Sequence, residues 1–249
     1  MPDFRFLRAL LRLLRLGLHV LTGLILAMLL PIFSGERRAG IIRRWLARLP
    51  RLLGVKVDYP RQTLPAGSLW VANHSSWLDI PILGGLADNV VFLSKAEVRR
   101  WPVIGFFARV AGTLFIERGT GSALAAEAIA SGLEEGKRIM IFPEGTTTNG
   151  LKVRRFHSRL FKPVVDLNRC VQPIALRYYD AQHNRTTLAA YTSNGRLLKS
   201  LWRVVMADRI YVALNISEPI WPDNQQPRPR DYLARSAQRV IQTVVESGC

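Results

Sequence analysis

The stretch "VANHSSWLDI", residues 71–80, joins an apolar run to a polar turn and then to a second apolar run. Val71 and Ala72 continue the run "SLW", which is typical of a short buried strand. His74 precedes Asp79 by five positions, so a turn can return the carboxylate to the imidazole ring. Two interpretations of this pair stay open: a turn histidine with a helix-capping aspartate, or a general base held by a carboxylate.

After Val55, short apolar runs alternate with helical segments. An alanine-rich helix, "GSALAAEAIASGLEEGK", is expected to close at Gly136, and a last amphipathic helix to end near Val245. Buried strands that alternate with helices predict an α/β fold with a mixed, partly parallel sheet flanked by helices. The expected strands are "SLWVANH", "NVVFLSK", "GTLFIER", "RIMIFPEG", "VQPIALRYY" and "RIYVALN".

Polar residues stand at the end of three of these strands. Asn73 and His74 end one strand, Glu117 and Arg118 end another, and the turn Glu144–Gly145–Thr146 follows a third. Strand ends in an open α/β sheet converge on one crevice. We therefore expect these residues to line a single site.

The N-terminal segment combines arginines with a long apolar run. The uncharged residues 16–33 follow the basic part, and a second amphipathic segment, residues 37–53, carries arginines on one face. The arginines of the first segment recur at helical spacing in one narrow sector: Arg5, Arg8, Arg12 and Arg15.

Because basic residues flank the apolar run on both sides, we expect a membrane-associated helix pair, re-entrant or interfacial, whose arginines contact anionic headgroups. A single transmembrane anchor is the alternative, since the run is just long enough to span a bilayer. The expected division is an anchoring pair, residues 1–54, followed by a catalytic α/β domain, residues 55–249.

The charge of the chain narrows the class of partner. Its 249 residues carry 35 basic and 18 acidic side chains, a net charge of +17, so an anionic partner is expected. The arginines concentrate beside the apolar anchor and no aromatic–basic recognition block appears, which favours a bilayer over nucleic acid. Cys170 and Cys249 stand apart from any histidine cluster, so we expect no metal site.

The residue types at the strand ends suggest a reaction class. A histidine oriented by a carboxylate can abstract a proton, because the carboxylate stabilises the imidazolium that forms. The sequence holds no G-x-S-x-G nucleophile motif, so His74 is expected to activate a hydroxyl of the substrate. Arg118 and the Glu144–Gly145–Thr146 turn offer a guanidinium, backbone N–H groups and a hydroxyl suited to a phosphate.

Four segments in order resemble the conserved blocks of the glycerolipid acyltransferases, the 1-acylglycerol-3-phosphate O-acyltransferase family. "NHSSWLD" resembles that family's N-H-x-x-x-x-D block, and "GTLFIER" resembles its second block. "FPEGTTTNG" resembles the third, F-P-E-G-T, and "VQPIAL" resembles the fourth. The blocks span residues 71–176, and the basic N-terminal helix pair also resembles that of bacterial members.

This resemblance implies roles for individual residues. His74 would deprotonate the acceptor hydroxyl and Asp79 would orient it, with no acyl-enzyme intermediate. The acceptor's headgroup site would include Arg118, Glu144 and Gly145. Further expected substrate contacts are Thr146, Asn73 and Lys95, the last of which resembles a family lysine near the active site.

The resemblance also implies the substrates and the location. The acyl donor would be the thioester of acyl-CoA or of acyl carrier protein, used as a co-substrate with no metal or other cofactor. The enzyme would work on the cytoplasmic face of the inner membrane, on a lysolipid that is most simply 1-acyl-sn-glycerol-3-phosphate.

Three alternatives stay open at this point. The family often has a basic residue directly after F-P-E-G-T, whereas this chain has Thr147, Thr148 and Asn149, so another acceptor such as a lyso-ornithine lipid also fits. A thioesterase would use His74 to activate water. A non-catalytic lipid-binding protein would need neither the base nor its orienting carboxylate.

Overall fold

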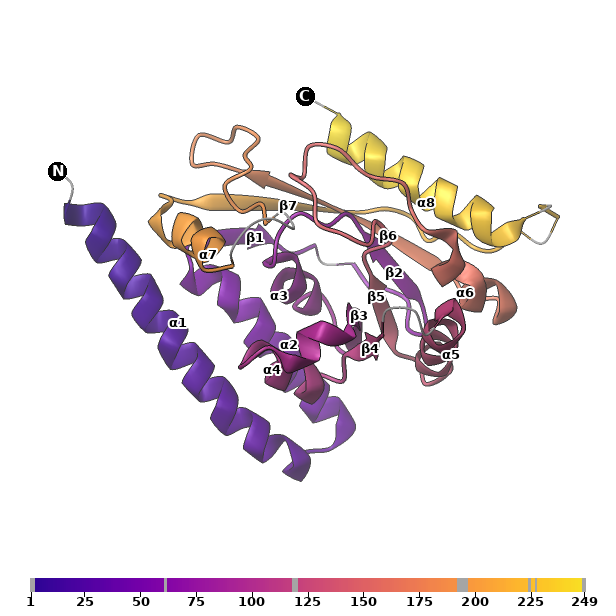
Figure 1. The fold of residues 1–249 in the computed structure, drawn as a ribbon, viewed down its shortest axis with the longest axis horizontal. Coiled ribbons are helices and arrows are strands. Elements are labelled where there is room, and N and C mark those ends of the chain that lie inside the picture. The colour runs from indigo at the N-terminus through magenta and orange to yellow at the C-terminus, as the bar shows by residue number, and fades with distance from the viewer. Residues whose placement is uncertain are drawn as a thin grey trace.

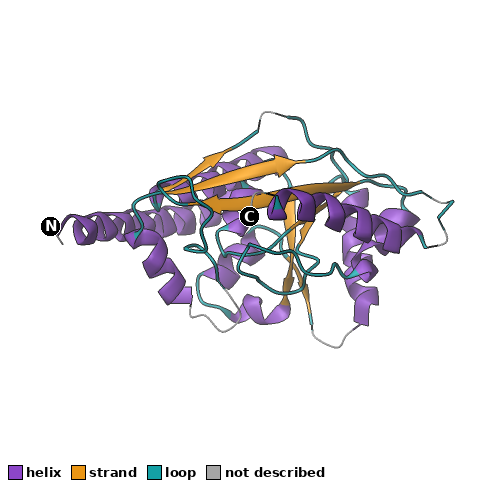
Figure 2. Cartoon of the chain, turned by 90° about the horizontal axis from the view of Figure 1, so that it is seen from above, coloured by secondary structure: helices purple, strands orange, loops and turns teal. Residues whose placement is uncertain are grey.

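The computed structural model describes residues 3–60, 62–117, 121–191, 197–223, 225–226 and 228–247. Within these ranges a seven-stranded sheet has the order β1-β7-β6-β2-β5-β3-β4. Neighbouring strands are parallel except for the antiparallel pair β6 and β7, which confirms the predicted mixed sheet. The strands cross the middle of the molecule (Figures 1 and 2): β1 (Val55–Asp58), β2 (Leu69–Ala72), β3 (Val90–Lys95), β4 (Leu114–Ile116), β5 (Arg138–Ile141), β6 (Val171–Tyr179) and β7 (Ile210–Ile216).

Helices flank this sheet, as the sequence predicts. The alanine-rich helix ends at Glu134, before Gly136 takes a φ of 75°, and the last helix ends at Glu246. The α-helices in the described residues are α1 (Asp3–Leu29), α2 (Gly35–Leu52), α3 (Asp79–Gly84), α4 (Ile104–Val110), α5 (Gly121–Glu134), α6 (Lys162–Asp166), α7 (Leu197–Met206) and α8 (Pro229–Glu246). Three short 3₁₀ helices in the same residues are η1 (Leu30–Ile32), η2 (Ala96–Arg100) and η3 (Ser158–Phe161).

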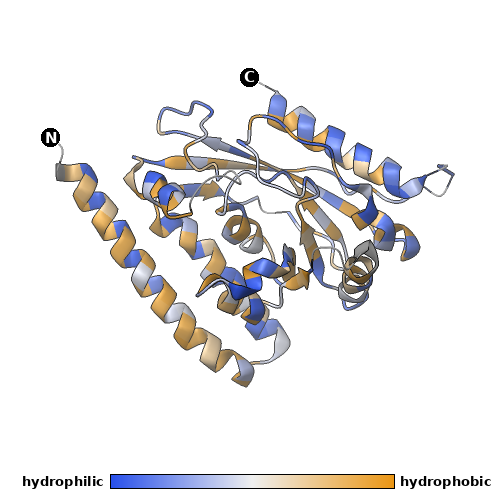
Figure 3. Ribbon diagram, viewed as in Figure 1, coloured by the Kyte–Doolittle hydropathy of each residue, from blue (hydrophilic) through white to orange (hydrophobic). Residues whose placement is uncertain are grey.

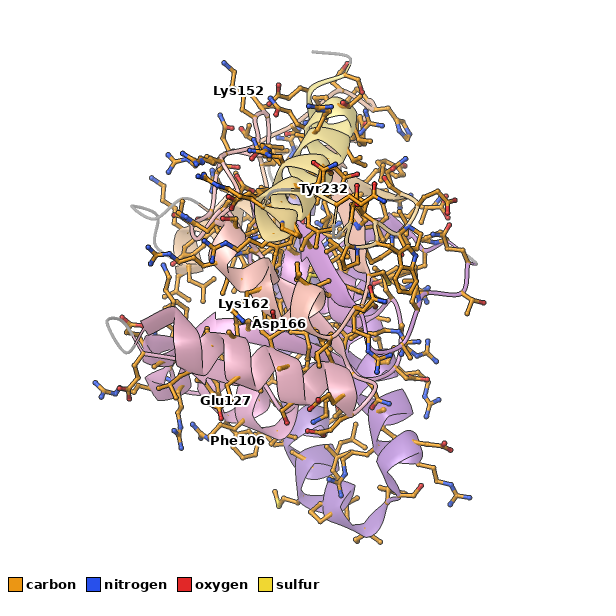
Figure 4. The ribbon with its side chains drawn as sticks, turned by 90° about the vertical axis from the view of Figure 1, so that its right-hand side faces the viewer. Phe106, Glu127, Lys152, Lys162, Asp166 and Tyr232 are labelled. Atoms are coloured by element: carbon orange, nitrogen blue, oxygen red, sulfur yellow. The ribbon has the colours of Figure 1, made fainter. Side chains whose placement is uncertain are left out.

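The central strand β2 is buried on both faces because helices cover each side. Trp70 and Ala72 belong to an apolar cluster that includes residues of α3 and α7, whereas Leu69 and Val71 belong to a second cluster with α5, α6 and α8. Successive side chains of a strand point to opposite faces, which accounts for this division. The α5 and α8 side is seen in Figure 4, where Lys162 and Asp166 of α6 form an ion pair.

The two N-terminal helices pack closely against each other. The Trp45 ring of α2 stacks on the imidazole of His19 in α1, with ring centroids 4.6 Å apart. A Cβ atom at Gly23 would stand 2.6 Å from the Trp45 ring, so only glycine leaves room for the indole there. The predicted helix pair is therefore present, and a single glycine sets how closely its members approach.

Two arginines of α1 point toward the protein, where the sequence predicts contact with headgroups. Arg12 donates hydrogen bonds to the backbone oxygens of Val205, Ala207 and Asp208, at the end of α7. Arg8 forms an ion pair with Asp208, with 2.7 Å between nitrogen and oxygen. The last carbonyls of a helix lack intrahelical partners and attract cations, so these two arginines bind the end of α7, a partner that the sequence did not predict.

Exposed apolar side chains occur along the whole length of α1, and much of its ribbon has the colour of hydrophobic residues (Figure 3). In the described part of the chain, one helix, Phe4–Ile32, is long and apolar enough to cross a membrane. Its apolar surface continues onto α7, where Leu198 and Trp202 are exposed and the Trp202 ring lies 6.5 Å from that of Phe6. Exposed apolar surface of this extent, beside basic residues, is suited to contact with lipid.

Candidate active site

The histidine and aspartate of the opening stretch meet at the carboxyl end of β2. The chain leaves β2 at Ala72 and turns through residues 73–78, and Asp79 is the first residue of α3. The Nδ1 atom of His74 lies 2.8 Å from Oδ2 of Asp79. The same oxygen accepts the backbone N–H groups of Ser75 and Ser76 at 2.8 and 2.9 Å. The fully buried Asp79 side chain is thus provided with the donors that a carboxylate needs away from water.

This geometry assigns the two nitrogens of His74. Because Asp79 accepts at Nδ1, the neutral ring carries its proton there and has its lone pair on Nε2. The imidazole stacks on Phe142, which follows β5, with ring centroids 3.9 Å apart. The side chain keeps 18% of its surface exposed, so a substrate hydroxyl can reach the ring. Asp79 and Phe142 together fix the orientation of the imidazole, which suits a general base.

A tyrosine that the sequence did not single out completes the pair. The hydroxyl of Tyr178 donates to Oδ1 of Asp79 at 2.5 Å, from the far end of β6. Burial and the neighbouring Asp79 carboxylate raise the pKa of Tyr178 well above its ordinary value, so this hydroxyl stays protonated and remains a donor. At the end of β6 the buried Tyr178 stands between the less buried Arg177 and Tyr179, but only the pairing of β6 with β2 brings it to Asp79.

Replacing Tyr178 with phenylalanine is expected to lower kcat about tenfold and to lower Tm by several degrees, because Oδ1 of Asp79 loses a donor inside the core. Tyr179→Phe is the matched control, since that ring lies on the other face of β6 against Arg177 and Arg185. Steady-state kinetics and thermal unfolding of both variants test this. Equal behaviour of the two variants would show that the hydroxyl of Tyr178 does not position Asp79.

Glu144 joins the His74 turn to a second loop. Its buried carboxylate accepts the backbone N–H of His74 at Oε1 (2.9 Å) and that of Arg154 at Oε2 (2.8 Å). Burial raises the pKa of Glu144, while the two N–H donors act in the opposite direction. The backbone N–H of Thr148 also donates to the carbonyl of His74, at 2.8 Å. The loop that begins at Pro143 is therefore hydrogen-bonded directly to the turn that carries His74.

The turn after Glu144 depends on glycine. Gly145 has a φ of 69° and donates its N–H to Phe142, and Thr146 follows at the half-exposed start of the loop. The His157 ring lies 3.5 Å from where a Cβ of Gly145 would stand. His157 is exposed and stands beside this turn.

The other predicted site residues lie in different surroundings. The Asn73 side chain is buried and forms two hydrogen bonds with the backbone of Leu176, so in this structure it pins β2 to β6. Lys95 is exposed at the end of β3, beside Ile116 of β4. Arg118, at the end of the predicted strand "GTLFIER", lies outside the described residues, and β4 ends at Ile116. Substrate contacts of these three residues stay predictions.

The expected convergence of strand ends is confirmed for two of the three strands. Because β2 and β5 are adjacent and parallel, His74 and Glu144 leave the sheet at the same edge and come into contact. The third strand, β4, ends at the same edge because it is parallel to β3 and β3 is parallel to β5. However, β3 lies between β4 and β5, so β4 is not adjacent to the strands that carry His74 and Glu144.

Comparisons with known proteins show which family this chain is similar to. The family model described as Acyltransferase matches residues 55–177. A lyso-ornithine lipid O-acyltransferase from Pseudomonas aeruginosa is 44% identical over 82% of this chain and 78% of its own length. A 1-acyl-sn-glycerol-3-phosphate acyltransferase from Neisseria gonorrhoeae is 34% identical over 66% of this chain and 64% of its own length.

A solved structure shares the fold. The crystal structure of the 1-acyl-sn-glycerophosphate acyltransferase PlsC from Thermotoga maritima matches with a TM-score of 0.69 at 21% identity, over 98% of both chains. The resemblance read from the four sequence blocks is confirmed by the family model and by the relatives together. The chain belongs to the acyltransferase family.

Proposed function

We propose that this acyltransferase moves a fatty acyl group from a thioester donor to the free hydroxyl of a lysolipid, with His74 as the base. The observation that carries the proposal is the contact between Nδ1 of His74 and the buried Asp79 carboxylate. That contact leaves Nε2 with a lone pair for the substrate. The relatives that are similar to this chain are named as lysolipid acyltransferases, which supports the same reaction.

The reaction follows from the geometry in one displacement. Nε2 of His74 takes the proton of the acceptor hydroxyl while that oxygen attacks the carbonyl carbon of the thioester. A carbon–oxygen bond forms, the carbon–sulfur bond breaks, and the thiolate leaves with the proton that the imidazolium returns. Asp79 stabilises the imidazolium between these two events, because its carboxylate is already bound to Nδ1.

The first acceptor we propose is 1-acyl-sn-glycerol-3-phosphate. Its phosphate would lie near the Glu144–Gly145–Thr146 turn, where exposed cations follow along the same loop: Lys152, Arg154 and Arg155. The backbone of Arg154 is bound to Glu144, which keeps this basic part of the loop near His74. Asn73, Lys95 and Arg118 complete the set of residues proposed for substrate binding.

A lyso-ornithine lipid is the second candidate acceptor. The relative from Pseudomonas aeruginosa, named for that activity, is more similar to this chain than the relative from Neisseria gonorrhoeae that is named for the phosphate acceptor. Both acceptors offer a hydroxyl to the same base, so the catalytic residues do not distinguish between them.

The remaining partners follow from the surface of the molecule. The protein associates with membranes through α1, and we propose that it sits on the cytoplasmic face of the inner membrane among anionic lipids. The proposed donor is acyl-CoA or acyl carrier protein, and the displacement proceeds with side chains alone, without a metal or other cofactor. A net charge of +17 suits either an acidic carrier protein or an anionic bilayer.

An acyl-transfer assay in detergent tests the proposal. Purified protein is given labelled acyl-CoA or acyl carrier protein with lysophosphatidic acid, lyso-ornithine lipid or lysophosphatidylcholine. We expect acylation of lysophosphatidic acid or of lyso-ornithine lipid, and the faster of the two identifies the acceptor. Thioester cleavage with no acylated lipid would make the protein a thioesterase, and neither product would make it a lipid-binding protein.

A further inference from the structure

The hollows between α1 and α2 are lined by arginines. One has a volume of about 360 Å³ and the other about 520 Å³, and Arg15, Arg51 and Leu52 line both. We call this surface the arginine groove. The arginines that line it are Arg8, Arg12, Arg15, Arg43, Arg44, Arg48, Arg51 and Arg209.

The charges of the groove are mostly uncompensated by acidic groups. No aspartate or glutamate is among the residues that line either hollow, within the described chain. Just outside them, Asp208 pairs with Arg8 and Asp88 pairs with Arg43. Cations gathered this closely repel one another, so an anion that enters the groove gains their combined attraction.

One buried arginine holds the floor of the groove in place. Arg12 is only 7% exposed and is fixed by three carbonyl oxygens at the end of α7. A Cβ at Gly54 would stand 1.9 Å from its guanidinium, so the close approach of β1 to this side chain requires glycine. The groove is therefore built into the contact between α1 and the sheet domain.

The apolar wall of the groove indicates the class of ligand. Phe4, Leu7 and Leu11 line one hollow and are exposed on α1, where they belong to the apolar surface described above. An acidic protein would meet these side chains with polar surface, whereas a phospholipid offers acyl chains beside an anionic headgroup. The arginines therefore suit the anionic headgroup of a lipid, and the neighbouring apolar side chains suit its acyl chains.

The topology places the groove at the catalytic end of the sheet. Arg51 and Gly54 precede β1, and Arg209 precedes β7. Both strands run opposite to β2, because β1 is parallel to β7, β7 is antiparallel to β6, and β6 is parallel to β2. The start of β1 and the end of β2, which carries His74, therefore lie toward the same end.

We propose that the arginine groove binds the phosphate of an anionic phospholipid of the bilayer, at a site separate from the one that holds the acceptor. The lipid's acyl chains run along the exposed face of α1. A lipid held there keeps the catalytic end of the sheet toward the membrane surface. This inference rests on the membrane partner proposed above, and it concerns binding, not acyl transfer.

Native mass spectrometry of the full-length protein in detergent tests the site with phosphatidylglycerol as the probe and phosphatidylcholine as the uncharged comparison. We compare two double variants that each remove two positive charges from the helix pair. Arg15→Gln with Arg51→Gln alters both hollows, whereas Arg37→Gln with Arg38→Gln alters exposed arginines of α2 that line neither. Thermal unfolding and circular dichroism check that both remain folded.

We expect the wild-type protein and the Arg37/Arg38 variant to retain a discrete phosphatidylglycerol adduct and to prefer it over phosphatidylcholine. The groove variant should bind phosphatidylglycerol about tenfold more weakly. The adduct should persist in His74→Ala, so a failure of the catalytic proposal would not remove it.

Several results would overturn the proposal. Equal losses in the two double variants would mean diffuse attraction between basic helices and lipid. Displacement of the lipid by millimolar inorganic phosphate would mean a site for free phosphate. Groove-dependent binding of acyl carrier protein, with phosphatidylglycerol binding unchanged, would assign the groove to the acidic donor protein.

Discussion

Replacing His74 with alanine is expected to lower kcat by about three orders of magnitude, because the acceptor hydroxyl loses the group that takes its proton. KM for the lysolipid should change little, since Glu144 and the loop that it fastens remain. Acyl-transfer rates measured with the acceptor found for the wild-type enzyme check this. Activity that survives in His74→Ala would remove the histidine from the mechanism.

The packing of His74 offers a second measurement on the same variant. The alanine leaves an opening against Phe142, on which the imidazole is stacked in the native protein. Imidazole added to the assay can enter that opening and accept the proton, so we expect it to restore part of the lost rate. The control is His183→Ala, because His183 stacks on Tyr211 and lies apart from the catalytic turn in sequence.

Replacing Asp79 with asparagine is expected to lower kcat by two to four orders of magnitude, a range set by other enzymes with a carboxylate-oriented histidine. An asparagine amide that donates toward Nδ1 would favour the tautomer with its proton on Nε2, and that tautomer cannot accept a proton from the substrate. Initial rates over a range of pH test the effect.

The Asp79→Asn substitution is also expected to reduce stability, and this effect must be distinguished from the effect on kcat. Oδ2 of Asp79 accepts from Ser75, Ser76 and His74, so an amide that turns its nitrogen toward His74 leaves the two serine N–H groups without their acceptor. Thermal unfolding should therefore show a lower Tm as well, and rates are compared at a temperature where the variant is folded. Asp58→Asn, at an exposed end of β1, is the control. A folded Asp79→Asn enzyme with near-normal kcat would show that the carboxylate does not orient the base.

The local pattern of apolar and polar residues was sufficient to predict much of the fold. The apolar runs that predicted strands are strands, and the alternation with helices predicted a sheet covered on both faces, because a strand buried on both sides must be apolar throughout. Helix α7 was not anticipated. Its residues 197–206 mix exposed Leu198 and Trp202 with buried Ser200, so composition and burial disagree there.

The spacing of the N-terminal arginines was not sufficient to predict which protein groups they contact. Helical spacing places Arg5, Arg8, Arg12 and Arg15 in one sector, and a sector of arginines beside an apolar run indicates headgroup contact. In the structure Arg8 and Arg12 contact the end of α7, almost two hundred residues later in the chain, and the helical spacing did not predict that contact. The carbonyls that attract them belong to a helix end whose position depends on the packed fold.

The sequence by itself determined the contact between the proposed base, His74, and its carboxylate, Asp79, because the two residues are local neighbours and one turn brings them together. Tertiary structure alone decided what completes the site. Tyr178 reaches Asp79, and Glu144 reaches the backbone of His74, only because β6 and β5 pair in parallel with β2. Contacts across a sheet depend on strand order and register, which are set by the packing of the whole domain and leave no spacing to read in the linear chain.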